Sequence, residues 1–288
     1  MMSANPGNSI DLSSSSLDLA FGLEERLSLE CYSSAGHNWR HPSIPSGLFA
    51  LYLENKWIDS GSLTLQDRHI MIDHSRPGVR ECHATLTADG LNVQHHWRVY
   101  DDSALTEQWQ TVSNTGPEPL RITRLDSFSL NIPADNRYTL SSFNSDWGQE
   151  FEPVEHVLDA HHDVILETRA GRASKGMHPW FSLTAADGHV LTGSVAWSGN
   201  WMLRFEPLAD GFHLSGGLSD WAFAIDLPPG STIQTPKIIL ATGPNLNAAA
   251  QQYTQIGRKY WYPRNTLSEA IPVEWNHWWS YMESLVEL

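Results

Sequence analysis

Cysteine and basic residues are scarce in this sequence. Of its 288 residues only Cys31 and Cys82 are cysteines, which excludes a disulfide framework and matches no metal-binding spacing. There are 18 lysines and arginines against 33 acidic residues, so the formal net charge is -15. This charge excludes nucleic acid and anionic membrane surfaces as partners, because their phosphates require basic side chains. A neutral ligand such as a sugar is compatible with it.

Long apolar runs are also missing. No stretch approaches the ~18 apolar residues of a membrane span, and the first residues show no basic segment followed by an apolar one. The sequence therefore predicts a soluble, cytoplasmic protein. Residues 1–16 are small and polar and include a serine run, so we expect them to be disordered.

Short alternating segments dominate the chain up to about residue 241. Leu91, Val93, His95, Trp97 and Val99 form a strict apolar alternation, which predicts a half-buried strand. Residues 120–122 and 128–132 suggest another strand or a bulged pair. Residues 190–197 and 201–205 flank a Ser-Gly-Asn turn, which suggests a hairpin. Many short strands between turn residues indicate an all-β sandwich.

One segment breaks this pattern. From Leu246 the apolar residues recur at helical spacing, which predicts a helix over about 246–260, with Asn245 or Asn247 as its cap and Pro263 beyond its end. Together these patterns predict a sandwich domain over residues 17–264 that ends in one helix.

Five segments carry a family resemblance and occur in the family's order. They are SFNSDWGQEFEP (142–153), LETRAGRASKGMHPWFSL (166–183), VAWSGNW (195–201), LPPGSTIQTP (227–236) and IPVEWNHWWSY (271–281). The first resembles a Gly-x-Trp-x-x-Glu region, the second an Arg-Gly-x-Ser-Ser segment, and the third a Trp-Ser-Gly-Asn-Trp hairpin. On these motifs the chain resembles the amino-terminal domain of glycoside hydrolase family 36, the bacterial α-galactosidases.

The resemblance implies a fold and a division of labour. It implies a large antiparallel β-sandwich, a supersandwich of the galactose-mutarotase-like type, followed by one helix. Residues 265–288 are then the first strand region of a truncated catalytic (β/α)₈ barrel, which needs roughly 200–250 residues. In the family the nucleophile and the acid/base are aspartates on later barrel strands. We therefore expect no catalytic residue and no α-galactosidase activity in this chain alone.

The resemblance also places candidate sugar-binding residues. Trp275, Asn276 and Trp278 fall near the carboxyl end of the presumed first barrel strand, where barrel sites are built, and are expected to line a pocket only in a full-length protein. Trp147 is a fourth candidate, because an indole packs against a pyranose face. The implied partner is a galactoside or another neutral sugar, with no cofactor, and a homo-oligomer formed through the sandwich domain is a further expectation. GHNWRHP, residues 36–42, echoes a loop whose acid reaches a sugar in some members, but Asn38 replaces that acid here.

The remaining polar residues favour structural roles. Asp146 and Glu150 flank Trp147 and are expected to be solvated, and Arg169 and Arg172 are expected to form a salt bridge or an interdomain contact. The histidine pairs 95–96 and 161–162 predict no metal site, because adjacent strand residues face opposite sides.

Two further functions remain open. The chain is alternatively a stand-alone carbohydrate-binding or assembly module. It is less readily a sugar mutarotase, which shares the sandwich fold but uses a His acid and a Glu base that the sequence does not display clearly. Polarimetry of galactose separates the two, since only a mutarotase speeds the approach to equilibrium.

Overall fold

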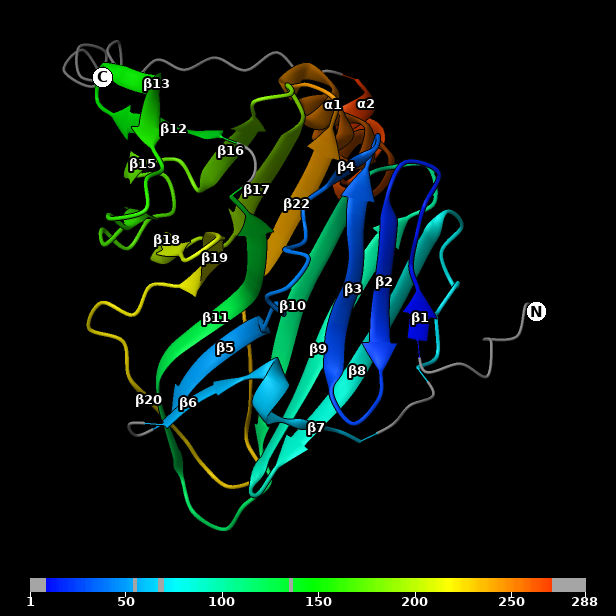
Figure 1. Cartoon of the computed structure of the whole chain (residues 1–288), viewed down its shortest axis with the longest axis vertical. Coiled ribbons are helices and arrows are strands. Elements are labelled where there is room, and N and C mark those ends of the chain that lie inside the picture. Colours follow the sequence, from blue (N-terminus) through cyan, green and yellow to red (C-terminus); the bar gives the residue numbers. More distant parts are fainter. Residues whose placement is uncertain (1–8, 54–55, 67–69, 135–136, 271–288) are drawn as a thin grey trace, which may run out of the picture. The chain divides into compact units, whose positions relative to one another are not determined.

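The computed structural model describes residues 9–53, 56–66, 70–134 and 137–270. It divides into two compact units, Met1–Tyr253 and Thr254–Leu288. The described strands all lie in the first unit, where they form three antiparallel sheets (Figure 1).

The largest sheet has eleven strands. Its main path runs β13-β12-β16-β17-β22-β10-β9-β8-β7, while β15 pairs with β12 and β21 pairs with β10. Its strands are β7 (Thr64–Leu65), β8 (Val79–Ala88), β9 (Leu91–Tyr100), β10 (Leu105–Asn114), β12 (Tyr138–Asp146), β13 (Gln149–Val157), β15 (Gly176–Met177), β16 (Trp180–Ala185), β17 (Val190–Ala196), β21 (Thr232–Gln234) and β22 (Lys237–Gly243).

The second sheet has seven strands and the third has four. The seven-stranded sheet follows β14-β18-β19-β11-β5-β6, with β20 paired to β11. Its strands are β5 (Leu48–Leu53), β6 (Lys56–Asp59), β11 (Leu120–Pro133), β14 (Val164–Glu167), β18 (Trp201–Leu208), β19 (Gly211–Leu218) and β20 (Ile225–Leu227). The four-stranded sheet consists of β1 (Ser9–Asp11), β2 (Asp18–Leu23), β3 (Leu27–Ser34) and β4 (His37–Asn38). A short 3₁₀ turn, η1 (Ser60–Ser62), follows β6.

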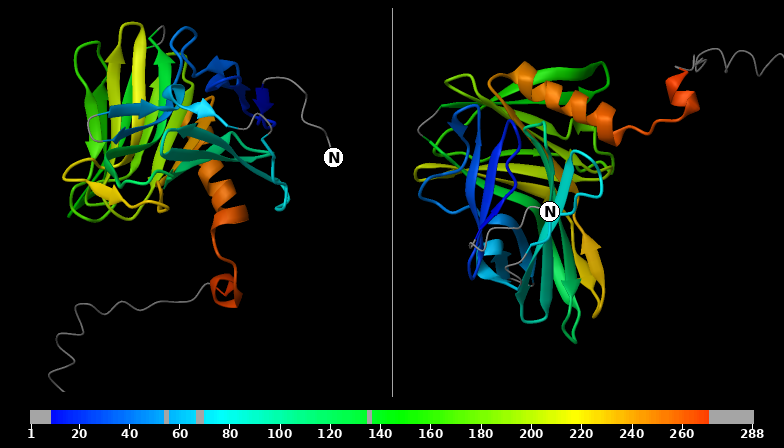
Figure 2. Two further views of the ribbon diagram at one scale, coloured as in Figure 1. Left: turned by 90° about the horizontal axis from the view of Figure 1, so that it is seen from below. Right: turned by 90° about the vertical axis from the view of Figure 1, so that its right-hand side faces the viewer.

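One face of the eleven-stranded sheet packs against both smaller sheets. The Trp97 ring of β9 lies 4.4 Å from that of Phe21 in β2, and His95 stacks 5.5 Å from Phe49 in β5. Figure 1 shows the blue strands β2 and β3 in front of β8–β10, and Figure 2 gives two further views of the layers. Alternation in β9 therefore directs its apolar residues into a core between layers.

The expected fold class is confirmed, and so is the patterning of several segments. Residues 91–99 fall in β9, and residues 120–132 form the single strand β11, whose register against β19 shifts between Asp126 and Phe128. This shift marks a β-bulge, which bends a strand that would otherwise run straight.

The predicted hairpin of residues 190–197 and 201–205 is wrong. β17 pairs with β16 and β22 in the eleven-stranded sheet, whereas β18 pairs with β14 and β19 in the seven-stranded sheet. Residues 198–200 thus cross from one sheet to the other. None of residues 198–200 has a positive φ, so the segment lacks the left-handed residue with which a three-residue hairpin loop closes.

The expected disorder of residues 1–16 does not hold for residues 9–16. β1 pairs with β2, and Leu12 is fully buried. The serine run is ordered by hydrogen bonds: Ser14 Oγ donates to the carbonyl of Ser103 at 2.6 Å, and Arg80 donates to the carbonyl of Ser13 at 2.6 Å. Apolar residues on either side of the serines anchor this polar segment to the sandwich.

The predicted helix is present but shorter. α1 spans Leu246–Ile256, and Asn245 Oδ1 accepts from the backbone N–H of Ala248 at 2.9 Å, so Asn245 is the cap. In the first unit Tyr253 anchors this helix by donating to the carbonyl of Ile239 at 3.2 Å. Beyond it a π-type turn, η2 (Gly257–Trp261), and the short α2 (Thr266–Glu269) belong to the second unit.

The described helices are all too short or too polar to cross a bilayer. The segment 271–281, interpreted above as a first barrel strand, lies outside the described residues.

Candidate functional site

The four predicted sugar-binding residues are placed very differently. Trp275, Asn276 and Trp278 lie outside the described residues. Trp147 lies in the turn between β12 and β13 and is 93% exposed to solvent. A single exposed indole is not a site, so its neighbours decide what this region can do.

Two of the motif segments meet beside Trp147. Segment 142–153 forms the hairpin of β12 and β13, and segment 166–183 supplies β15, which pairs with β12 through Asn144 and Met177. The backbone N–H of His178 donates to the carbonyl of Phe143 at 2.9 Å. Lys175 Nζ forms an ion pair with Asp146 Oδ1 at 3.0 Å. The hairpin end is thereby fixed to the loop that precedes β16.

A third motif segment joins them from the crossing between β17 and β18. The Asn200 side chain accepts from the backbone N–H of Gly171 at 2.7 Å, and Trp201 Nε1 donates to the carbonyl of Ala173 at 2.6 Å. Gly171 has φ 71°, a conformation that favours glycine. We call the region formed by residues 146–151, 169–180 and 197–200 the motif surface; it lies around β12, β13, β15 and β18 at the upper left of Figure 1.

Aromatic side chains are exposed on and beside the motif surface. Phe151 is 66% exposed, Trp197 42% and Trp221 51%. Phe151 stacks on His178 with ring centroids 4.1 Å apart, although its φ of 60° is strained for a residue with a side chain. Exposed aromatic faces of this kind bind sugar rings or partner surfaces.

The charged residues of this region have structural partners. Arg169 forms an ion pair with Glu167 at 2.7 Å and lies 5.4 Å above the Trp221 ring, in agreement with the structural role expected for it. Asp146 is held by Lys175, and Glu150 is exposed. The acids flanking Trp147 are thus surface groups, which matches the expectation that they are solvated.

A second polar group lies on the outer face of the eleven-stranded sheet. We call Glu81, Arg98, Tyr100, Glu107 and Lys237 the central charge cluster. Arg98 contacts Glu81 at 2.7 Å and Glu107 at 3.1 Å, Lys237 contacts Glu107 at 3.0 Å, and Tyr100 donates to Glu107. Burial acts to raise the pKa of Glu107, but the Tyr100 hydroxyl, Arg98 and Lys237 together hold it below its usual range. Glu107 is therefore a paired structural carboxylate.

The histidine pairs behave as two separate cases. His95 faces the core and accepts from Gln110 Nε2 at 2.7 Å, while His96 faces outward and stacks on Trp109 at 4.9 Å, so this pair diverges as expected. His161 and His162 lie in a loop rather than a strand, where Asp159 Oδ1 accepts both of their backbone N–H groups.

Two cavities open on the described part of the chain. One of about 140 Å³ is lined by Asp73, Arg76, Glu81 and Arg98, and one of about 370 Å³ by residues of 14–18, 34–35 and 242–244 with Ala104 and Gln252. Neither lining combines a histidine with a glutamate, the pair on which a mutarotase depends.

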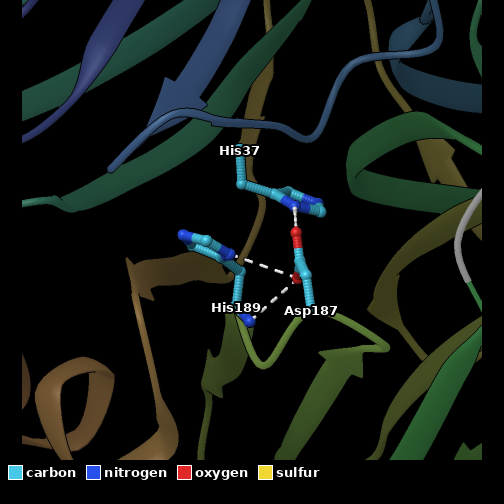
Figure 3. A group of neighbouring side chains, drawn as sticks. All are labelled: His37, Asp187 and His189. Atoms are coloured by element: carbon cyan, nitrogen blue, oxygen red, sulfur yellow. Dashed lines mark hydrogen bonds and ion pairs between the residues drawn. The ribbon is translucent and has the colours of Figure 1, made fainter.

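One cluster was not foreseen from the sequence. His37, Asp187 and His189 converge so that their ligand atoms lie within 4.8 Å of one another (Figure 3). Asp187-Gly188-His189 is a short sequence signal, but His37 is 150 residues from Asp187 in the chain. Only the docking of the four-stranded sheet brings it to the turn between β16 and β17.

Comparison with known families places these features in context. The family model described as the glycosyl hydrolase family 36 N-terminal domain matches residues 79–228, slightly more than half of the chain. The chain belongs to glycoside hydrolase family 36. The match covers the first three motif segments, so the resemblance drawn from them is confirmed, and it includes the whole motif surface.

Relatives in family 36 are longer than this chain. Alpha-galactosidase AgaA of Geobacillus stearothermophilus is 26% identical over 180 residues, which are 59% of this chain and 24% of that protein. This chain thus aligns with about a quarter of that relative's length. The crystal structure of an α-galactosidase from Lactobacillus brevis superposes with a TM-score of 0.77 at 17% identity, over 90% of this chain and 42% of that one.

Sugar complexes exist among the structural neighbours. Variants of AgaA crystallised with raffinose and with stachyose superpose with TM-scores of 0.73 and 0.74, at 18% and 19% identity and over 87% of this chain and 43% of theirs. At such identities the superposition establishes the shared fold.

The loop at residues 36–42 is well ordered in this family 36 chain. Asn38 is exposed, Trp39 is fully buried, and Arg40 Nε donates to the carbonyl of Leu29 at 2.6 Å. Asn38, at the place of the acid expected from some family members, is therefore exposed to solvent between two anchored residues, but as an amide.

Proposed function

We propose that this chain is the non-catalytic amino-terminal sandwich domain of an α-galactosidase-type glycoside hydrolase. The observation that carries the proposal is the family match over residues 79–228 on a fold that superposes with intact α-galactosidases over 90% of this chain. The relatives' sugar complexes support a terminal α-galactoside as the substrate class of the longer protein.

The chemistry of glycoside hydrolysis supports the non-catalytic part of the proposal. A retaining glycosidase places two carboxyl groups ~5–5.5 Å apart across the scissile bond. Among the described residues, the buried carboxylates Glu107 and Asp126 are held by arginine and lysine, and Asp126 contacts both Arg124 at 2.6 Å and Arg204 at 3.0 Å. Neither carboxylate lines either of the two cavities described above.

The direct test is release of nitrophenol from an aryl α-galactoside by the purified 288-residue chain. We expect no release above the buffer rate, with an intact family 36 α-galactosidase as the positive control. Turnover of ~1 per second, typical of enzymes, would contradict the proposal.

An accessory role in binding or assembly is a second candidate, favoured by the exposed aromatic residues of the motif surface. Here Trp147→Ala and Phe151→Ala would abolish either raffinose binding, measured by calorimetry, or self-association, measured by light scattering on a sizing column. Trp57→Ala is the matched control, because Trp57 is 43% exposed but lies beneath Arg124, 4.8 Å away and outside the motif surface. A chain that is monomeric and does not bind raffinose would eliminate this candidate.

We also propose that the protein is located in the cytoplasm. Cys31 and Cys82 are both free, and burial raises the pKa of Cys82 to about 12, so its thiol is inert. Free cysteines in a sandwich of this size fit a reducing compartment. Recovery of the protein in the periplasmic or secreted fraction of its host would contradict it.

A further inference from the structure

The cluster of His37, Asp187 and His189 has the composition and spacing of a metal site. His37 Nδ1 lies 2.9 Å from Asp187 Oδ2, and His189 Nδ1 lies 3.2 Å from Asp187 Oδ1. Two ligands that bind one tetrahedral ion at about 2.0–2.1 Å are roughly 3.3 Å apart. The two nitrogen–oxygen separations are close to this value, and the ligand atoms of all three residues lie within 4.8 Å of one another, so a small movement of the side chains completes the site.

Hydrogen bonding leaves a lone pair on His189 that faces Asp187. His189 Nε2 lies 3.2 Å from the carbonyl oxygen of Ala35, to which its N–H donates. In the neutral ring Nδ1 then carries the lone pair; it is also buried, and its 3.2 Å contact with Asp187 Oδ1 is not a hydrogen bond. A lone pair facing a carboxylate oxygen is repulsive unless a proton or a metal ion lies between them. A histidine whose second nitrogen donates to a backbone carbonyl is the usual arrangement at metal sites.

The side chains are held in place from both sides. His37 is 5% exposed and its ring stacks 4.3 Å from that of the buried Trp39. On the opposite turn, the backbone N–H of His189 donates to Asp187 Oδ1 at 3.1 Å, which fixes the carboxylate (Figure 3). Gly188 lies between these two residues at φ 91°. Ligands fixed by packing and hydrogen bonds bind an ion without first losing conformational freedom.

The donor set indicates the class of ion. Two imidazoles and one carboxylate suit zinc and neighbouring transition metals, whereas magnesium and calcium prefer oxygen ligands alone. The Asp187 side chain is 45% exposed, so solvent has access to complete the coordination.

We propose that His37, Asp187 and His189 bind a divalent transition-metal ion of the zinc type, which links β4 to the turn between β16 and β17. This ion joins the four-stranded sheet to the eleven-stranded sheet across 150 residues of chain. The site is independent of galactoside chemistry and of the motif surface.

The experiment is calorimetric titration of ZnCl₂ into the metal-free 288-residue chain, prepared without a histidine tag. We expect one saturable site with micromolar or tighter affinity. Because a ligand is removed, His189→Ala is expected to weaken zinc binding at least tenfold, and Asp187→Asn, which preserves the shape and the acceptor for the His189 N–H, is expected to do the same. His162→Ala is the matched control, since His162 forms a comparable pair with Asp159 at 3.0 Å on the surface, and it should leave the affinity unchanged.

Two readouts separate metal binding from a purely structural contact. Zinc should raise the melting temperature of the parent chain and of His162→Ala by several degrees, but not that of His189→Ala or Asp187→Asn. Co²⁺ should give the visible absorption of a four-coordinate site in the parent chain and in His162→Ala, but not in His189→Ala or Asp187→Asn. Absence of saturable 1:1 zinc binding up to about 1 mM, or binding that persists unchanged in both ligand variants, would overturn the proposal. In that case the cluster is an ion pair between a protonated histidine and Asp187.

Discussion

The strands at the centre of the eleven-stranded sheet differ from those at its β12–β13 edge in how far their aromatic and charged side chains are buried and paired. In β9 and β10 the inner face buries Trp97 and the outer face pairs every charge of the central charge cluster. At the motif surface aromatic residues are exposed, and one of them, Phe151, has a strained backbone. Stability is therefore concentrated in the centre, while the edge retains features that suit contact with another molecule.

The sharpest test of this contrast is to replace a tryptophan by alanine once at the centre of the sheet and once at its edge. Trp97→Ala removes a ring that is 2% exposed and lies against Phe21 and His95, so we expect a loss of about 3–5 kcal/mol in the free energy of unfolding. Trp147→Ala removes a ring that is 93% exposed, and the expected change is within about 0.5 kcal/mol. Urea unfolding followed by circular dichroism measures both. Equal losses would erase the distinction between centre and edge.

Charge at the centre is the next largest effect. Glu107→Gln leaves Arg98 and Lys237 without the carboxylate that they share, so the expected destabilisation is about 3 kcal/mol. Glu150→Gln, on the exposed edge, is the control and should change the unfolding free energy by less than about 0.5 kcal/mol. If the unfolding free energy of Glu107→Gln stayed at the parent value, the cluster would be dispensable.

Lowering the pH should reduce the free energy of unfolding through protonation of His95 in the unfolded chain. Burial lowers the pKa of His95 from 6.5 to about 3, so between these values the unfolded chain binds one more proton than the folded chain. Its contribution to stability is complete above pH 6.5 and is lost as the pH falls towards 3, by about 1.4 kcal/mol per pH unit. His95→Gln should reduce the slope of unfolding free energy between pH 6 and 4.5 by roughly that amount. Parallel slopes for parent and variant would show that His95 does not titrate on unfolding.

The smallest effect is expected at the strained edge residue. Phe151→Gly relieves a φ of 60° that costs roughly 1 kcal/mol in a residue with a side chain, while glycine adds flexibility to the unfolded chain. The net expectation is a gain of about 0.5 kcal/mol or less, visible as a slightly higher melting temperature. A loss above 1 kcal/mol would mean that stacking of Phe151 on His178 outweighs the strain.

Local patterning was sufficient for much of the fold. Strict alternation in residues 91–99 predicts β9, and helical spacing from Leu246 with the Asn245 cap predicts α1, because both depend only on neighbours along the chain. The serine run was misjudged, because its order depends on Ser103 and Arg80, far away in sequence.

The sequence by itself determined the fold class and the family, because the alternation of apolar residues and the order of the motifs are visible along the chain without any knowledge of contacts. Only the tertiary structure decided which sheet each strand joins, as the crossing between β17 and β18 demonstrates. It also decided that His37 meets Asp187 and His189. Both outcomes depend on how sheets pack face to face, and the free energy of that packing comes from residues that are distant in the chain.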